Sequence, residues 1–427
     1  MRRIAVIDIG KTNAKVLTVD LETGKETILA SRKNEVRAGP PYPHFDTNAL
    51  FDFILSSLRR AGEDAAPDAI SVTTHGCAAA LVDGDGALVL PVLDYEHEMP
   101  AAIASDYAMI RPDFSETGSP RLPGGLNLGA QLYWQARAFP DAFARVSQVL
   151  TLPQYWSFRL TTVAASEATL LGCHTDLWNP WASDFSSLVD RMGWRGLFPP
   201  VRPASAVLGG LSAEVAAATG LPQKTPVISG IHDSNASLLP WLEGEGPRGV
   251  ISTGTWMIVM SVRGRVVPLD ARRDVLVNVN AQGGPTPTAR FMAGREFDEL
   301  TQGRVVTPDP SDELAVLQRQ VMVMPSLHPD TGPFPGLQSE WMLAPANDAE
   351  RTAAAGFYAA LMARECLDLI GAEGEIVVEG PFGGNRGFLR MLATATGRPV
   401  VATGHGAGTG LGAAMLAGPR TARRSTC

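Results

Sequence analysis

The first residues whose types and spacing could do chemistry are Asp8-Ile9-Gly10-Lys11-Thr12-Asn13. They join a carboxylate at the end of an apolar run to a glycine turn that offers backbone N–H groups, a hydroxyl and an ammonium. Such a turn can hold phosphate oxygens, and Asp8 can hold Mg²⁺ or its waters. The Gly-x-x-x-x-Gly-Lys-Ser/Thr spacing of a Walker A loop is absent. An ordinary hairpin turn capped by Asp8 would have the same sequence, so both interpretations stay open.

The second half of the chain contains a similar segment, Ser252-Thr253-Gly254-Thr255-Trp256. The hydroxyls of Thr253 and Thr255 could donate to a phosphate, and Gly254 would let that phosphate approach the backbone. A generic turn would look the same. The pairing of two Gly-Thr turns, one in each half, favours phosphate binding.

Asp233 follows an apolar β-branched run in Gly230-Ile231-His232-Asp233-Ser234 and precedes a predicted helix. A carboxylate at such a strand end can accept the proton of a hydroxyl that attacks a phosphoryl group. The alternative is that Asp233 caps the helix, a role that aspartate fills well. The residues alone do not decide between a base and a cap.

The loop Glu379-Gly380-Pro381-Phe382-Gly383-Gly384-Asn385 connects a predicted strand to a predicted helix. Its two adjacent glycines would let the backbone lie against a planar base, and Asn385 could cap the helix or bind a nucleotide edge. The later run from His405 to Gly410 lacks Gly-x-Gly-x-x-Gly spacing, so a dinucleotide-binding fold is not predicted.

Strands and helices with the right periodicity surround these segments. In the first half, the pattern predicts a hairpin over residues 4–26, a helix over 47–62, strands over 69–76 and 87–98, and mostly helix over 126–160. The pattern restarts near residue 225 with a strand, a turn and a helix. It then predicts a hairpin over 249–264, a helix over 349–370, and further strands and helices up to residue 418.

Both halves therefore begin with strands and Gly-Thr turns and continue as alternating strands and helices. This arrangement predicts a duplicated α/β domain, with two lobes around a central cleft that binds the ligand. We place the first lobe at residues 1–225 and the second at 226–427.

Composition excludes several other classes of protein. The 427 residues are 45% hydrophobic and carry a net charge of −8, which gives no support to nucleic-acid or membrane-surface binding. No apolar run is long enough to span a bilayer, and Asp8 interrupts the short apolar start that would otherwise resemble a signal peptide. The four cysteines form no Cys-x-x-Cys pair. These features predict a cytoplasmic protein with reduced thiols.

The order of the motifs resembles that of FGGY carbohydrate kinases. The resemblance consists of Asp-Ile-Gly-x-Thr, Gly-x-His-Asp-Ser, Ser-x-Gly-Thr-Trp, and a late Gly-Gly-Asn before a helix, and it covers nearly the whole chain. It implies the duplicated actin-like ATPase (ribonuclease H-like) fold of that family. The histidine before Asp233 and the Gly-Thr-Trp run are most similar to the rhamnulokinase and L-fuculokinase branch.

The resemblance also implies roles for individual residues. Asp8 would organise Mg²⁺, and Asp233 would be the catalytic base. ATP would be bound by the two hairpin turns and the glycine loop, namely Gly10, Lys11, Thr12, Asn13, Thr253, Gly254, Thr255, Gly383, Gly384 and Asn385. The sugar would be bound at strand ends by His75, Gly76, Asp94, Glu96, His232 and Asp233.

The implied activity is ATP-dependent phosphorylation of a ketose or 6-deoxyketose at a terminal hydroxyl. Many relatives carry Trp-x-Asp where this chain has Asp94-Tyr95-Glu96, and often Glu where it has Ala407. An L-rhamnulose- or L-fuculose-like sugar, a pentulose and a tetrulose therefore all stay open, and so does a homodimer. The alternatives are an actin-like ATPase and a catalytically inactive sugar-binding protein of the same fold.

Overall fold

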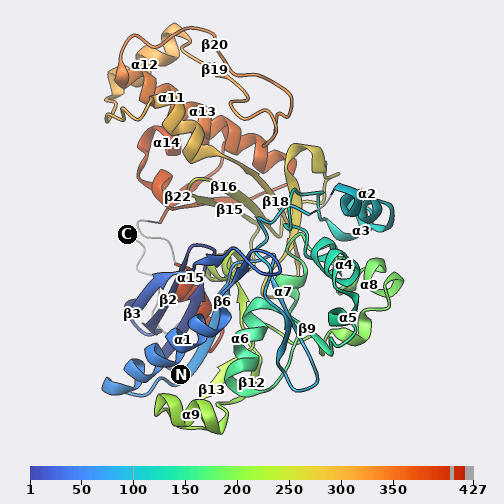
Figure 1. Cartoon of the computed structure of the whole chain (residues 1–427). Coiled ribbons are helices and arrows are strands. Elements are labelled where there is room, and N and C mark those ends of the chain that lie inside the picture. The colour runs from blue at the N-terminus through green and yellow to red at the C-terminus, as the bar shows by residue number, and fades with distance from the viewer. Residues whose placement is uncertain (100, 404–407, 419–427) are drawn as a thin grey trace. The chain divides into compact units, whose positions relative to one another are not determined.

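The computed structural model describes residues 1–99, 101–403 and 408–418. These residues form two compact units (Figure 1). Unit 1 contains the described residues of 1–240, 277–285 and 407–427, and unit 2 contains those of 241–276 and 286–406. Ala407 and the predicted polar tail from residue 419 onward lie outside the described residues.

The main sheet of unit 1 starts from the predicted hairpin. Strand β1 (Arg3–Ile9) pairs antiparallel with β2 (Asn13–Asp20), and β2 pairs with β3 (Lys25–Lys33). On the other side of β1, β6 (Ala69–Thr74) pairs in parallel. The sheet order is β12-β13-β6-β1-β2-β3, with β14 also paired to β6. The remaining strands of this unit are β4 (Val36–Arg37), β5 (His44–Phe45), β7 (Ala79–Val82), β8 (Leu88–Leu90), β9 (Gln148–Thr151), β10 (Trp178–Asn179), β11 (Asp184–Phe185), β12 (Val207–Gly210), β13 (Pro226–Ile228) and β14 (Ile231–His232).

Helices cover this sheet where the sequence has period-3.6 apolar faces. Helix α1 (Thr47–Asp64) begins at the cap Asp46, whose side chain accepts a hydrogen bond from Ala49 N. The other helices of unit 1 are α2 (Ala101–Ile110), α3 (Phe114–Thr117), α4 (Leu128–Ala138), α5 (Pro140–Phe143), α6 (Leu152–Thr161), α7 (Ala168–Leu171), α8 (Ser187–Arg191), α9 (Ala213–Thr219), α10 (Asp233–Leu238) and α15 (Thr409–Met415).

Unit 2 repeats the strand pattern of unit 1. Strands β15 (Arg248–Thr253) and β16 (Met257–Val262) form the second predicted hairpin, and β16 also pairs with β18 (Pro285–Phe291). Strand β21 (Glu375–Glu379) joins β15 in parallel, as β6 joins β1, and β22 (Val400–Ala402) follows it. The other elements of unit 2 are β19 (Val323–Met324), β20 (Glu340–Trp341), α11 (Ala293–Thr301), α12 (Pro310–Arg319), α13 (Asp348–Leu369) and α14 (Arg386–Thr396). Strand β17 (Val275–Val279) begins in unit 2 and continues into unit 1. The predicted duplication is therefore present.

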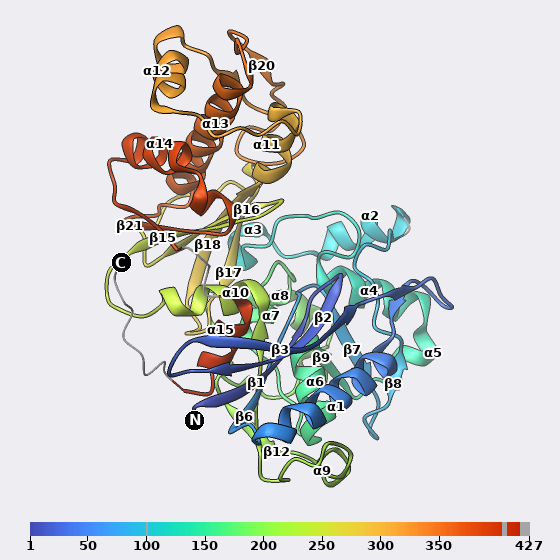
Figure 2. The ribbon, with the colours of Figure 1, turned by 90° about the vertical axis from the view of Figure 1, so that its left-hand side faces the viewer.

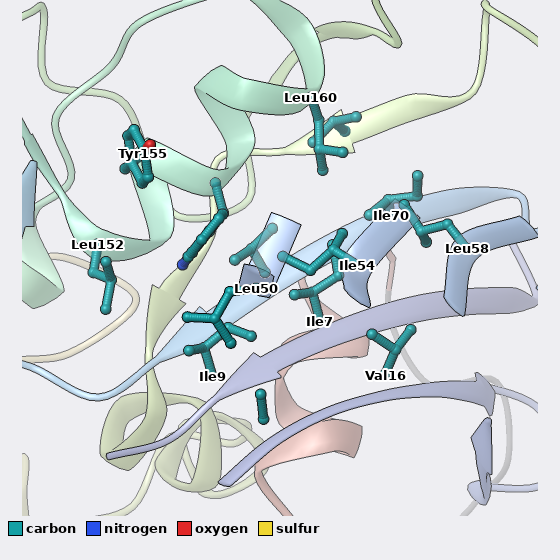
Figure 3. Close-up of a cluster of buried hydrophobic side chains, with 14 of the residues drawn as sticks. Ile7, Ile9, Val16, Leu50, Ile54, Leu58, Ile70, Leu152, Tyr155 and Leu160 are labelled. Atoms are coloured by element: carbon teal, nitrogen blue, oxygen red, sulfur yellow. The ribbon is translucent and has the colours of Figure 1, made fainter. Parts of the chain in front are cut away.

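The largest core of unit 1 lies between the main sheet and helices α1 and α6 (Figure 3). Ile7 and Ile9 of β1 meet Ile54 and Leu58 of α1, and all four side chains are fully buried. Burying one such side chain stabilises a fold by about 1.5–3 kcal/mol. This packing fixes the end of β1, which carries Asp8 and the glycine turn.

The C-terminal helix α15 belongs to unit 1 although it follows unit 2 in the sequence. It packs against α10 and β1 (Figure 2), and the Ser71 hydroxyl of β6 donates to Ala413 O at 2.7 Å. A Cβ on Gly412 would lie 1.7 Å from Ala236 O, so only glycine allows this close approach to α10. Strands β13 and β14, which follow the predicted lobe boundary, also belong to unit 1, because they pair with β6.

The predicted division into a first lobe at residues 1–225 and a second lobe at residues 226–427 stays a prediction.

Two predicted elements differ from the structure. The strand predicted over 87–98 ends at Leu90, because Pro91 has no N–H to continue the ladder. Asp94 is held instead by its backbone, whose N–H donates to Pro43 O at 2.9 Å. The region 126–160 is also less helical than predicted, because β9 interrupts it and pairs with β7.

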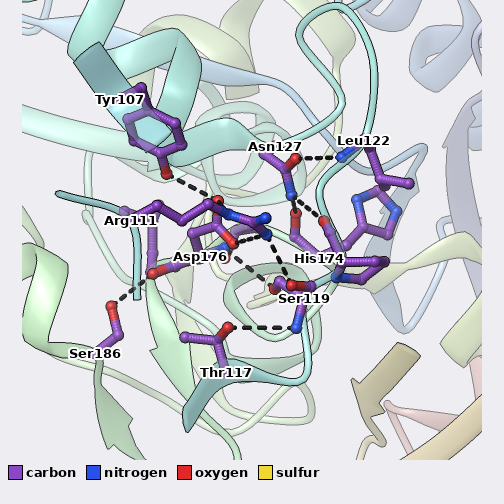
Figure 4. A network of polar contacts seen from close by, with 12 residues as sticks. Tyr107, Arg111, Thr117, Ser119, Leu122, Asn127, His174, Asp176 and Ser186 are labelled. Atoms are coloured by element: carbon purple, nitrogen blue, oxygen red, sulfur yellow. Dashed lines mark hydrogen bonds and ion pairs between the residues drawn. The ribbon is translucent and has the colours of Figure 1, made fainter. Parts of the chain in front are cut away.

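A buried polar network braces the helices of unit 1 around α4 (Figure 4). The fully buried Asp176 accepts hydrogen bonds from the Arg111 guanidinium and from the Tyr107 hydroxyl at 2.8 Å. Asn127 donates to His174 O at 2.8 Å and accepts from Leu122 N. The network thus fixes the loop that carries His174.

None of the described helices is both long and apolar enough to cross a membrane.

Candidate active site

The ends of three neighbouring strands in unit 1 bring the predicted catalytic and sugar-binding residues together. Strand β6 pairs in parallel with β1 on one side and with β14 on the other, and Thr74 lies opposite both Ile9 and His232. The next residues on each strand are Gly10, His75 and Asp233. The carboxyl ends of parallel strands are where open α/β sheets bind ligands.

Asp233 is held through only one of its carboxylate oxygens. Its Oδ1 accepts the Ser234 N–H at 2.6 Å and lies 3.2 Å from His232 Nε2. No described residue forms a hydrogen bond with Oδ2. The Asp233 side chain is 33% exposed, so solvent or a ligand can reach this oxygen. Burial raises the pKa of Asp233, and His75 and Ser234 partly oppose that rise. The free oxygen is therefore available to a ligand.

Asp8 lies one strand away from Asp233 and is buried at the end of β1. Its Oδ2 is 3.1 Å from the Lys15 ammonium on β2, a partner that the sequence analysis missed. Burial raises the pKa of Asp8, Lys15 lowers it, and the nearby Asp233 carboxylate raises it further. The two carboxylates are thus close enough to interact electrostatically.

Two histidines flank Asp233, and their hydrogen bonds indicate opposite tautomers. His75 Nδ1 lies 2.7 Å from Gly76 O, and a carbonyl only accepts, so Nδ1 carries the proton. His75 Nε2 is then an acceptor, and it is buried with no partner among the described residues. His232 Nδ1 faces the Asn235 Nδ2 donor at 3.4 Å, which leaves the proton on Nε2, where it points to Asp233. Burial lowers the pKa of His232 to about 4, so this ring is neutral at physiological pH.

Lys11 lies with the predicted sugar-binding residues. Its ammonium contacts Asp94 Oδ1 and lies 3.2 Å from Glu96 Oε2. It also lies over the rings of Tyr95 and Phe45, at 4.8 and 5.3 Å from their centroids. Two carboxylates therefore offset the charge of Lys11, and its predicted contact with phosphates stays a prediction.

The rest of the first glycine turn is held by a residue from outside the motif. Asn34 donates from Nδ2 to Gly10 O at 2.8 Å and from its backbone N–H to Thr12 O at 2.9 Å. Thr12 and Asn13 are exposed at the tip of the turn. Their side chains bond to each other, with Asn13 Nδ2 donating to Thr12 Oγ1 at 3.1 Å, and both remain accessible to a ligand from solvent.

In unit 2, the second hairpin turn lines a cavity of about 530 Å³. Gly254, Thr255 and Asn385 line it together with Phe297 and Phe382. Gly294 of α11 approaches the turn so closely that a Cβ there would lie 2.3 Å from Gly254 O. The cavity thus depends on a glycine that the sequence analysis did not single out.

Thr253 has a structural role within this hairpin. Its buried hydroxyl donates to Glu379 O at 2.5 Å and accepts the Phe382 N–H at 3.2 Å. It ties the hairpin to the glycine loop, whereas the exposed Thr255 faces the cavity.

The glycine loop forms a short 3₁₀ helix, Pro381–Gly384, followed by α14. Asn385 caps α14 by accepting the Phe388 N–H at 3.0 Å. Gly384 and Asn385 also line a second cavity of about 630 Å³, whose walls include Val305, Val306 and Pro308. Gly383 lies between these contacts, and a Cβ there would still be 3.5 Å from the nearest atom. The same cavity is also lined by Glu313, Arg386 and Arg390, so its wall combines apolar and charged side chains.

Both halves of the chain match one family. Residues 3–240 match the N-terminal domain of the FGGY family of carbohydrate kinases, and residues 245–425 match the C-terminal domain of FGGY carbohydrate kinases. The chain belongs to the FGGY family. The predicted family and the predicted duplicated actin-like ATPase fold are both confirmed.

Individual relatives are similar over different shares of their length. A carbohydrate kinase from Novosphingobium aromaticivorans is 37% identical, with a TM-score of 0.91 over 99% of this chain and 92% of that one. An L-fuculokinase of Salmonella typhi is 30% identical over 272 residues, which are 62% of this chain and 57% of the relative. A rhamnulokinase of Pectobacterium atrosepticum is 25% identical over 309 residues, covering 68% of this chain and 59% of the relative. The matches thus span little more than half the length of these two FGGY kinases.

Several residues at this FGGY site had no sequence signal. Lys15 and Asn34 are separated from the Asp8 motif, and only strand pairing brings them to it. Cys77 and His174 also meet beside His75, with Cys77 Sγ 3.6 Å from His174 Nδ1. No local pattern links residues so far apart in the chain.

Proposed function

We propose that this chain transfers the γ-phosphoryl group of ATP to a terminal hydroxyl of a ketose, with Asp233 as the general base. The observation that carries the proposal is the arrangement of Asp233. One oxygen is held by Ser234 and His232, and the other is open at the carboxyl end of β14, close enough to Asp8 for the two carboxylates to interact electrostatically. Family membership supplies the expectation of kinase chemistry.

In the proposed reaction, the sugar hydroxyl donates a hydrogen bond to Asp233 Oδ2. As the hydroxyl oxygen bonds to the γ-phosphorus, its proton passes to Oδ2, and the bond from phosphorus to the β,γ-bridging oxygen breaks to release ADP. The neutral His232 holds Oδ1 and leaves Oδ2 to the substrate. A raised pKa also suits the proton acceptor, because a more basic carboxylate takes up the proton more readily.

Asp8 fits a role at Mg²⁺. This ion accepts oxygen ligands and is often bound by only one or two carboxylates together with substrate phosphates and waters. Accordingly, among the described residues no three His, Cys, Asp or Glu side chains form a metal cage. Bound Mg²⁺ would neutralise charge on the phosphates. Asp8 would hold that ion, while Lys15 holds Asp8 in place.

The cavities of unit 2 suit a nucleotide. The hairpin turn at Gly254 and Thr255 offers a backbone N–H and a hydroxyl for phosphates. The cavity beside Gly384 and Asn385 offers Val305, Val306 and Pro308 for contact with an adenine ring, among charged residues that also line it. We assign Gly10, Thr12 and Asn13 of unit 1 to the phosphates as well.

Replacing Thr255 by valine should raise the KM for ATP about three- to tenfold and leave sugar affinity nearly unchanged, since one exposed hydroxyl bond is lost. Valine keeps the β-branched shape of threonine. Steady-state kinetics with ATP varied, and sugar binding measured without nucleotide, would check this result. Equal losses for both ligands would mean that the turn is structural only.

The proposed acceptor site favours a neutral polyhydroxylated sugar. His75 Nε2 and Asp233 Oδ2 are both acceptors that need donors, and hydroxyls supply them. The nearby Lys11 is already offset by Asp94 and Glu96, so it offers no free cation to an acidic sugar. The similarity to an L-fuculokinase and a rhamnulokinase favours a 6-deoxyketose.

A coupled ADP-release assay would test this proposal across tetruloses, pentuloses, 6-deoxyhexuloses, glycerol and uronates. We expect a neutral ketose to give a kcat/KM at least tenfold above glycerol and uronates, roughly the worth of one well-placed hydrogen bond to a buried group. Activity confined to glycerol or to an acidic sugar would overturn the substrate class. ADP release that no sugar stimulates would overturn the kinase proposal itself.

A further inference from the structure

Two buried residues at the start of α7 lie behind the proposed base. Glu167 is 2% exposed and Thr169 is fully buried. The Thr169 hydroxyl donates to Glu167 Oε2 at 2.5 Å, and the Thr169 hydroxyl oxygen accepts the backbone N–H of His232 at 3.1 Å. His232 immediately precedes Asp233, so this chain of bonds ends one residue from the base.

The direction of these hydrogen bonds is fixed by the carboxylate. Burial raises the pKa of Glu167 to about 7. Above that pH the carboxylate is ionised and only accepts, so the single proton of Thr169 points to Glu167. The lone pairs of the threonine oxygen then face the His232 N–H. Glu167 also accepts the backbone N–H of Thr169 at 2.9 Å, which holds its own side chain in position. The hydroxyl is therefore oriented before any ligand arrives.

The backbone that leads into Asp233 needs such a support. Strand β14 has only two residues, and Gly230 before it adopts a φ of +96°, which breaks the line of β13. The chain then turns directly into α10, whose N-cap is His232 and whose cap makes no side-chain hydrogen bond. Helix α7 contacts β14, and its Thr169 supplies the acceptor for the His232 N–H.

We propose that Glu167 and Thr169 are positioning residues, which aim the Asp233 carboxylate by fixing the His232 backbone. This inference rests on the proposed function. His232 holds Asp233 Oδ1 through its ring, so a shift of its backbone also moves the base. Misplacement of a catalytic group by about 1 Å can cost on the order of 10²-fold in rate.

Thr169→Val tests the proposal because valine keeps the shape and removes the acceptor. We expect kcat to fall by about tenfold to 10²-fold, with the KM for sugar and for ATP within about twofold of wild type. Thr169→Ser restores the hydroxyl and should recover most of kcat. Thr219→Val is the matched control, because the buried Thr219 hydroxyl also donates to a carbonyl, Val215 O, and accepts a backbone N–H, that of Leu221.

The outcomes separate the two proposals. If wild type phosphorylates a ketose and Thr169→Val has the kcat of Thr219→Val, the positioning role is wrong while the kinase proposal stands. If wild type phosphorylates no ketose, both fall. If Thr169→Val does not fold, Glu167→Gln tests the positioning role instead. A glutamine amide can donate as well as accept, so it no longer fixes the direction of the Thr169 hydroxyl proton. We expect Glu167→Gln to lower kcat at least threefold at unchanged KM, and a wild-type kcat would overturn the inference.

Discussion

Replacing Asp233 by asparagine should lower the kcat for sugar phosphorylation by about 10²–10⁴-fold, the usual cost of removing a general base. The amide keeps the size of the side chain and can still accept the Ser234 N–H through its oxygen. It cannot take up the proton of the sugar hydroxyl. A coupled ADP-release assay at saturating sugar and ATP would measure the loss, and nucleotide affinity should be unchanged.

The same substitution should affect catalysis and stability in opposite directions, and the pKa of Asp233 gives the reason. Burial raises that pKa above its unfolded value, so the stability from this carboxyl is present at low pH and lost as pH rises through the folded pKa. At pH 7 to 8 the ionised carboxylate therefore favours unfolding, and an uncharged asparagine does not. The Tm of Asp233→Asn should equal or exceed that of wild type.

A helix-cap role for Asp233 makes the opposite pair of predictions. His232 is the N-cap of α10 and Asp233 is its first residue. If Asp233 only stabilises this first turn by accepting the Ser234 N–H, the variant should lose Tm and keep kcat. Asp46→Asn is the control, because Asp46 caps α1 and lies outside the proposed catalytic machinery. It should keep wild-type turnover. An Asp233→Asn variant with a kcat within a few-fold of wild type would rule out the base.

Replacing Asp8 by asparagine should reduce kcat by about 10²–10³-fold at ordinary Mg²⁺ concentrations, because the site loses several kcal/mol of charge stabilisation for the transferring phosphoryl group. An amide oxygen is a weaker ligand than a carboxylate for a hard cation. The Mg²⁺ concentration for half-maximal activity should therefore rise, and excess Mg²⁺ should recover part of the rate.

A titration of activity against Mg²⁺ for wild type and Asp8→Asn would measure this shift. Asp20→Asn is the matched control, since Asp20 lies on the same hairpin but at its other end, paired with Arg2. It should leave the Mg²⁺ dependence unchanged. If the Asp8 variant shows the wild-type Mg²⁺ profile, Asp8 caps the turn and holds no metal.

The features that the sequence predicted well are those set by neighbouring residues. Both Gly-Thr hairpins and helix α13 follow from local alternation, from turn residues and from helical periodicity. The placement of Asp233 after β14 was visible for the same reason. These elements also carry most of the motifs that identify the family.

The features that escaped prediction depend on pairing between distant segments. The Lys11 contact with Asp94 joins residues that are 83 positions apart, and the Thr169 contact with His232 spans 63. The strand predicted over 87–98 was too long because apolar residues on both sides of Pro91 hid the missing N–H. A one-dimensional pattern predicts which residues are buried, but it does not show which side chains meet.

The position of α15 has a consequence for how the protein is made. The chain leaves the ribosome from its N-terminus, so the sheet that holds Asp8 and Asp233 is synthesised long before the helix that packs on it. The hydrogen-bond partner of Ser71, Ala413, is synthesised 342 residues later. Until then, apolar residues such as Ile4, Val6 and Ala236 lack the helix that covers them. Unit 1 is therefore completed last, and a nascent chain that stops before residue 409 exposes an apolar surface to chaperones and proteases.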